Sequence, residues 1–107
     1  MGRIQDGINL AGYVFDGPFD STGDLRSVPG IYAILDQLEQ GWHVVDVGES
    51  ETVQDRVHAH DRAPCWTRAR RGRLGVAVLY LPGSSAPQRR FVEQAVRAAY
   101  RPSCGQQ

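Results

Sequence analysis

The chain has 107 residues, of which 41% are hydrophobic and 22% are charged, and its formal net charge at pH 7 is zero. This composition predicts one soluble globular domain, residues 1–107, and excludes a disordered tail. No apolar stretch approaches the roughly 20 residues of a membrane-spanning helix, and the N-terminus lacks a basic start before an apolar run, so we expect a cytoplasmic protein without a membrane partner.

The zero net charge conceals an uneven distribution of charge along the chain. Eleven of the 12 acidic residues precede Arg62, nine of the 12 basic residues lie from Arg62 onward, and every basic residue is arginine. Guanidinium groups bind phosphate oxygens in a bidentate manner, so the arginine-rich half suggests a polyanionic partner. The alternative is that the two halves neutralise each other across the fold.

The first half of the chain predicts a β-hairpin. Residues 30–35 form a β-rich apolar run, residues 37–41 read as a turn, and residues 42–47 form a second β-rich run. Residues 1–27 are rich in glycine and aspartate and are expected to be an N-terminal extension. Within them, the alternating residues 13–15 indicate an edge strand.

Helical signals follow the hairpin. Ser50 offers a helix N-cap, and a helix is expected to run to about Asp61, with Pro64 limiting its continuation. The arginine-rich residues 68–73 are expected to form a solvated loop or a short helical turn. Residues 76–81 predict another buried strand. The last helix is expected from about Pro87 to Tyr100.

The expected fold is therefore α+β, with a small central antiparallel or mixed sheet of about three strands flanked by helices in the order β-β-α-β-α. Its last helix carries an apolar stripe that is suited to packing on the sheet. The stripe consists of Val92, Ala95, Val96 and Ala99.

An ordered set of residues within 28–105 resembles the GIY-YIG nuclease superfamily. The set consists of Gly30-Ile31-Tyr32, Asp46-Val47-Gly48, Arg56, His60 and Glu93. The family pattern is a GIY strand, a YIG strand, an Arg and a His or Tyr on the next helix, a Glu on a later helix, and often a closing Asn. This chain resembles a small stand-alone member with a DVG variant of the YIG motif. Asp46 stands at the Tyr of YIG, and Gly105 stands at the closing Asn.

The resemblance implies a divalent-metal-dependent endonuclease that hydrolyses DNA phosphodiester bonds. Glu93 would be the ligand of Mg²⁺ or Mn²⁺, and a single carboxylate suffices for an ion that keeps most of its waters. The spacing alone also fits exposed ion pairs of Glu93 with Arg89 and Arg97.

The other implied catalytic residues are Tyr32, Arg56, His60 and Asp46. Arg56 would hold the scissile phosphate, and His60 would accept a proton from water or from Tyr32. Taken singly, Arg56 and His60 read as surface residues of a helix, and Tyr32 as a packed strand aromatic. Asp46 is expected to accept hydrogen bonds from Arg56 or from a metal-bound water, or else to mark a weakened site.

DNA is the expected partner, with binding dominated by phosphate contacts, and a partner subunit for recognition is left open. The alternative function is a catalytically weakened nucleic-acid-binding module with the same fold. The expected phosphate-binding residues are Arg62, Arg68, Arg70, Arg71, Arg73 and Arg89.

The two cysteines, Cys65 and Cys104, are expected to be buried thiols in a reducing compartment. A zinc site that joins them to His58 and His60 is a weaker alternative, because paired Cys-x-x-Cys spacing is absent. Trp66 is expected in the core, with base stacking as the alternative.

Overall fold

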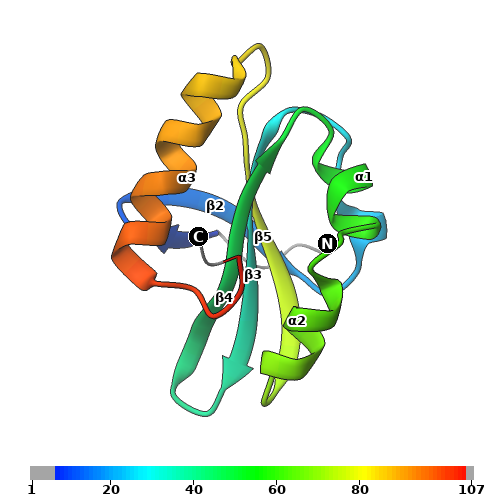
Figure 1. The fold of residues 1–107 in the computed structure, drawn as a ribbon, viewed down its shortest axis with the longest axis vertical. Coiled ribbons are helices and arrows are strands. Elements are labelled where there is room, and N and C mark those ends of the chain that lie inside the picture. Colours follow the sequence, from blue (N-terminus) through cyan, green and yellow to red (C-terminus); the bar gives the residue numbers. More distant parts are fainter. Residues whose placement is uncertain (1–6, 106–107) are drawn as a thin grey trace.

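A five-stranded antiparallel sheet, in the order β1-β2-β5-β3-β4, forms the centre of the protein (Figure 1). The computed structural model describes residues 7–105. The strands are β1 (Ile8–Leu10), β2 (Tyr13–Phe19), β3 (Gly30–Leu38), β4 (Gly41–Ser50) and β5 (Arg73–Tyr80). The helices are α1 (Val53–His58), α2 (Ala63–Ala69) and α3 (Ala86–Tyr100), and a 3-10 turn spans Thr22–Asp24.

Strands β3 and β4 confirm the predicted hairpin and extend beyond the predicted bounds. Their pairing runs from Gly30 opposite Ser50 to Leu38 opposite Gly41. The predicted strand near residues 76–81 is β5, which pairs with the other edge of β3. Strand β3 therefore lies between its two partners and is the most buried strand of the sheet.

The expectation of about three strands in the order β-β-α-β-α is wrong. The predicted edge strand is β2, which pairs with β1 on one side and with β5 on the other. The helical region after the hairpin contains two helices, α1 and α2. Leu10 of β1 and Phe15 of β2 are buried, so this N-terminal hairpin belongs to the core. Residues 1–6 and 106–107 of the predicted domain lie outside the described residues.

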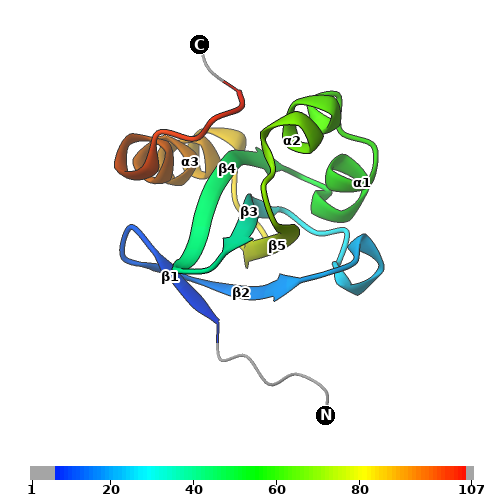
Figure 2. The ribbon, with the colours of Figure 1, turned by 90° about the horizontal axis from the view of Figure 1, so that it is seen from below.

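The helices cover opposite faces of the curled sheet (Figure 2). On one face, α1 and α2 pack against Tyr32, Ile34 and their neighbours. On the other face, α3 and the β1–β2 hairpin enclose a second core cluster around Ile31 and Leu35. These alternating side chains of β3 therefore supply both cores, as expected for a strand that is covered on two sides.

The helix boundaries differ from those predicted between residues 50 and 69. Ser50 is the last residue of β4, and α1 begins three residues later, at Val53. Pro64 lies in the first turn of α2, where its missing N–H needs no partner, so it begins a helix instead of limiting one. The final helix agrees with the prediction. Its N-cap Ser85 and Gln88 form a reciprocal capping box.

A β-bulge in β4 fixes the direction of Asp46. Ile34 pairs with Asp46, and Leu35 pairs with Val44, which leaves Val45 as the extra residue. Such a bulge breaks the alternation of side chains along the strand. Val45 packs in the core that α1 and α2 cover, and Asp46 reaches Trp66 of α2.

Within residues 7–105 no helix has both the length and the apolarity needed to cross a bilayer.

Candidate functional site

The structure brings Tyr32 and His60 together under α1 and α2. Tyr32 extends from β3, and His60 lies in the connection between the two helices. The phenol oxygen of Tyr32 is 2.6 Å from Nε2 of His60. The imidazole also lies against the Trp66 ring, with 4.7 Å between centroids. Tyr32 is only 1% exposed and His60 only 5%, so the pair is not presented to solvent.

The tautomer of His60 follows from its second partner. The backbone N–H of Arg62 donates to Nδ1 at 2.9 Å, so Nδ1 carries no proton. Burial, together with the charges of Arg56 and Arg62, lowers the pKa of His60 to about 4, and the ring is neutral at pH 7. A neutral ring of this kind carries its proton on Nε2 and donates it to Tyr32. The expected transfer of a proton from Tyr32 to His60 is therefore not available in this arrangement.

The environment of Tyr32 favours the neutral phenol. Burial raises the pKa of Tyr32 to about 12, although the charges of Arg56 and Arg62 oppose the shift. Gly48 faces this hydroxyl across the strand pair, and a Cβ at Gly48 would collide with the Tyr32 side chain. The glycine of the Asp46-Val47-Gly48 motif therefore has a packing role, since it leaves room for the phenol.

Arg56 lies at the rim of this pair. One of its terminal nitrogens is 3.0 Å from Asp61, and 39% of its side chain is exposed. Its charge lowers the pKa of both Tyr32 and His60, so the three predicted residues share one environment. Arg56 is the member of this group whose side chain is accessible from solvent.

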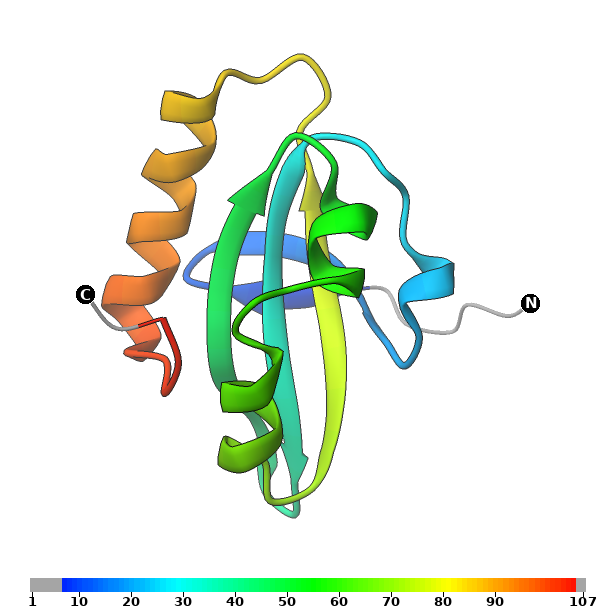
Figure 3. The same cartoon turned by 45° about the vertical axis from the view of Figure 1, so that its right-hand side comes forward.

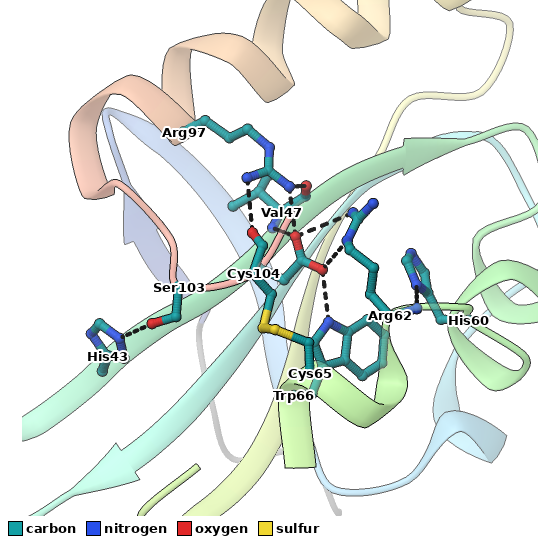
Figure 4. The surroundings of a disulfide bond; sticks show 10 residues. His43, Val47, His60, Arg62, Cys65, Trp66, Arg97, Ser103 and Cys104 are labelled. Carbon is teal, nitrogen blue, oxygen red and sulfur yellow. Dashed lines mark hydrogen bonds and ion pairs between the residues drawn. A yellow bond between two sulfur atoms is a disulfide. The ribbon is translucent and has the colours of Figure 1, made fainter. Parts of the chain in front are cut away.

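Asp46 is the centre of a buried ion-pair cluster, and Figure 4 labels its partners Arg62, Trp66 and Arg97. Its carboxylate accepts hydrogen bonds from Arg62 Nε at 2.7 Å, from Trp66 Nε1 at 2.7 Å and from Arg97 Nη2 at 2.6 Å. The backbone N–H of Val47 donates to it at 2.8 Å. The cluster joins β4, α2 and α3 through one side chain that is 0% exposed.

The predicted partner of Asp46 was wrong in detail. Arg62 and Arg97 compensate its charge, and no hydrogen bond or ion pair links it to Arg56 within residues 7–105. Burial raises the pKa of Asp46, but hydrogen bonds from Arg62, Trp66 and Arg97 outweigh burial and leave the pKa below its usual 3.8. Both carboxylate oxygens are engaged, so Asp46 is a structural anion and not a free base. A lone aspartate in an apolar strand signals a buried partner, but sequence does not identify which arginine.

Glu93 lies at the same edge of the sheet. Its carboxylate is 3.5 Å from Arg97 Nε, and its side chain is 17% exposed. Burial raises the pKa of Glu93, and the charges of Arg97 and Arg62 lower it. The i,i+4 ion pair with Arg97, which the spacing allowed, is therefore present.

The surroundings of Glu93 carry more positive than negative charge. The two guanidinium groups that act on this carboxylate repel a second positive charge. The nearby carboxylate of Glu49 is taken by Arg89 at 2.7 Å. In the described part of the chain, no three His, Cys, Asp or Glu side chains gather as a metal site.

The predicted phosphate-binding arginines divide into two groups. Arg89 is 2% exposed and is held by Glu49 and by the carbonyl oxygen of Ser84, so it does not lie on a binding surface. Arg62 is committed to Asp46. The exposed group lies at the end of α2, in the turn that follows and at the start of β5. It consists of Arg68, Arg70, Arg71 and Arg73.

Asp36 holds the turn that carries these arginines. Its buried carboxylate accepts the backbone N–H of Arg71 at 2.6 Å and that of Gly72 at 2.8 Å. Gly72 packs so closely on the Gln37 carbonyl that a side chain would collide with it. The turn is therefore fastened to the end of β3, a function of Asp36 that sequence reasoning missed.

Cys65 and Cys104 form a disulfide, and the expectation of two thiols was wrong (Figure 4). The zinc alternative fails with it, because neither sulfur is a free thiolate. The disulfide ties α2 to a C-terminal segment that passes along β4, where the Cys104 N–H donates to the Val45 carbonyl at 2.8 Å. Gly105 ends this segment at a φ of 77°, and a Cβ there would lie 2.8 Å from Asp46 Oδ1. Glycine at the family's Asn position therefore fits the packing.

Comparison with protein-family models, with curated proteins and with solved structures gives no match for this chain. The relation to the GIY-YIG superfamily thus stays a prediction that rests on the motif residues.

Proposed function

We propose that this protein is a nucleic-acid-binding module that contacts the phosphate backbone, with DNA as the expected ligand. In this proposal the residues that match a GIY-YIG active site serve chiefly to build the fold. The observation that carries the proposal is the segregation of the arginines. Four exposed guanidinium groups lie within residues 68–73, and no ion pair within residues 7–105 neutralises them.

The acidic half of the chain supplies the partners of the buried and half-buried arginines. Its acids hold the inward-facing arginines, as Asp46 does with Arg62 and Arg97, and as Glu49 does with Arg89. A zero net charge therefore coexists with an unneutralised arginine surface. Unpaired arginines held on a fixed turn are suited to a ligand with regularly spaced phosphates.

The buried site supports binding over hydrolysis. Hydrolysis needs a group that takes a proton from water, yet His60 presents a protonated Nε2, the pKa of Tyr32 is raised to about 12, and Asp46 is fully hydrogen-bonded. None of the three is an effective base at neutral pH.

The test measures DNA affinity by fluorescence anisotropy over a range of salt concentrations. The triple variant Arg68→Gln, Arg70→Gln, Arg71→Gln should bind more weakly to every sequence. Its plot of log K against log salt should be less steep, by up to about 0.9 for each phosphate that is no longer neutralised. A matched control replaces Arg90 and Arg101, which are exposed at α3 and its C-terminal end, by Gln and should bind like wild type. Wild-type binding that is independent of salt contradicts the proposal.

Hydrolysis of DNA remains a second candidate, favoured by one observation. Tyr32 and His60 are 28 residues apart in sequence, yet they meet in a 2.6 Å hydrogen bond beside Arg56, the family's phosphate-binding position. If the phenolate of Tyr32 is the base, nicking of supercoiled plasmid should speed up as the pH rises toward about 12, the pKa of Tyr32.

The plasmid assay is run with Mg²⁺ or Mn²⁺ and with the variants Tyr32→Phe and Glu93→Ala. Nicking that both substitutions abolish supports the enzyme. Wild-type protein that binds plasmid but does not nick it supports the binding module.

A further inference from the structure

The tip of the β3–β4 hairpin and the turn between α2 and β5 lie side by side at one end of the molecule (Figure 3). Gln37 of β3 connects them, because it pairs with Trp42 on one side and with Arg73 on the other. Residues directly opposite one another in a sheet point to the same face. A row of three side chains therefore crosses three strands: Trp42, Gln37 and Arg73. The backbones of Trp42 and Arg73 are about 10 Å apart, which is two strand spacings.

Trp42 is a fixed aromatic surface at this end. Its side chain reaches across β3 toward Gly75, where a Cβ would lie 3.6 Å from Cζ3 of the indole. Trp42 nevertheless remains 37% exposed, and the neighbouring Leu38 is 38% exposed. The hairpin tip also lines a pocket of about 480 Å³, formed by Leu38, Glu39, Gln40, Gly41 and Trp42. Trp42 and Leu38 therefore offer apolar surface beside this pocket, within reach of the arginines across β3.

The combination of a planar aromatic surface with nearby arginines has a specific chemistry. We infer that this end of the molecule binds single-stranded nucleic acid, with a base stacked on Trp42 and the adjacent phosphates on Arg73, Arg71 and Arg70. This inference rests on the proposed function and specifies its ligand. In a duplex the bases are stacked on each other and their faces are closed, whereas every base of a single strand offers a face to an aromatic ring.

The charges at this end of the molecule determine the path of the bound single strand over the surface. Glu39 places a carboxylate at the hairpin tip, which repels phosphate. Arg73 lies across β3 from Trp42, and Arg70 and Arg71 lie in the turn that leads to it. The backbone of the bound strand therefore passes over Gln37 and Arg73, toward the turn that Asp36 holds in place. Because that turn is fixed before binding, little ordering of the arginine-bearing backbone is required.

An anionic membrane surface is the competing ligand, since tryptophan, leucine and arginine also occur together at lipid interfaces. The small size of the apolar area argues for the nucleic acid. The exposed apolar side chains at this end are Trp42 and Leu38, whereas surface anchoring of a helix or loop needs a wider apolar face or a second membrane signal.

The experiment compares a short single-stranded oligonucleotide with a duplex of the same sequence by fluorescence anisotropy. Wild-type protein should bind the single strand more tightly. Trp42→Ala should weaken binding of the single strand about 5- to 150-fold, the effect of losing one stacked base, and should leave duplex binding unchanged. Trp42→Phe, which keeps an aromatic face, should recover most of the loss. The control is Phe91→Ala, since Phe91 is 72% exposed on α3 and lies outside the proposed site.

The possible failures are distinguishable. If Trp42→Ala has no effect while the triple arginine variant loses binding to both ligands, this inference is overturned and the proposed function stands. If neither DNA form binds, both are overturned. If wild type binds vesicles of phosphatidylserine and phosphatidylcholine in a Trp42-dependent way and does not bind the single strand, the site is a membrane site and the inference is overturned.

Discussion

Replacing Asp46 by asparagine tests whether this residue holds the fold together. The substitution keeps the shape of the side chain and removes its negative charge. Arg62, whose side chain is 29% exposed, then loses its partner in the cluster, and Arg97, 14% exposed, keeps only its 3.5 Å ion pair with Glu93. An asparagine also brings an NH₂ group into the site, and in either orientation it meets a donor: Arg62 and Trp66 on one side, Arg97 and Val47 on the other.

The expected cost is large for a single substitution. Removing one partner from a buried, hydrogen-bonded ion pair costs about 3–5 kcal/mol, because the remaining charges keep their desolvation penalty. For a domain of this size, a loss of 3 kcal/mol lowers the Tm by about 12 °C or more. The same change should leave DNA binding by any folded fraction almost unaltered, since Asp46 is 0% exposed.

The assay is equilibrium unfolding in urea with the disulfide intact, followed by circular dichroism. The control is Asp61→Asn, which removes the exposed partner of Arg56 and should leave the midpoint unchanged. A loss of less than about 1 kcal/mol for Asp46→Asn would show that solvent or other groups compensate the two arginines, and would refute the role assigned to Asp46.

Four further predictions concern pH, the disulfide and the fixed turn. The folded-state pKa of His60, about 4, is below its usual 6.5. The contribution of neutral His60 to stability is therefore complete above pH 6.5 and is lost as the pH falls toward 4. An NMR titration that gives a His60 pKa near 6.5 contradicts this prediction. The pKa of Asp46 is also lowered, so its contribution to stability is lost as the pH falls from about 3.8 through the folded-state pKa. The acid-unfolding curve of Asp46→Asn should lack this loss of stability. Cys104→Ser removes a crosslink between residues 39 apart and should cost about 2–4 kcal/mol, and reduced wild type should match it in urea unfolding; equal stability of the oxidised and reduced forms would show that the C-terminal segment needs no crosslink. Asp36→Asn leaves one N–H of the turn facing an amide donor, so hydrogen exchange at Arg71 and Gly72 should accelerate. Unchanged protection there would mean that the hydrogen bonds between β3 and β5 hold the turn without the carboxylate.

Local patterns in the sequence determined the elements whose signals lie within a few residues. The β3–β4 hairpin follows from two β-rich runs around a polar turn, and α3 follows from Ser85, Pro87 and an apolar stripe. The motif spacing also anticipated that Tyr32 and His60 meet. The boundary errors near Ser50 and Pro64 arose because a cap residue and a proline each fit two positions, and only the packing of α1 and α2 on the sheet selects one.

The tertiary structure alone decided what surrounds each site residue. The partners of Asp46 come from α2 and α3, and the disulfide partner of Cys65 comes from the last residues of the described chain, all distant in sequence. Charge counts predicted an arginine surface, but not that Arg89 would be buried with Glu49 while Arg73 stays exposed. Which groups become desolvated depends on how the helices meet the two faces of the sheet. Desolvation in turn sets the protonation of Tyr32 and His60, so their chemistry cannot be read from spacing.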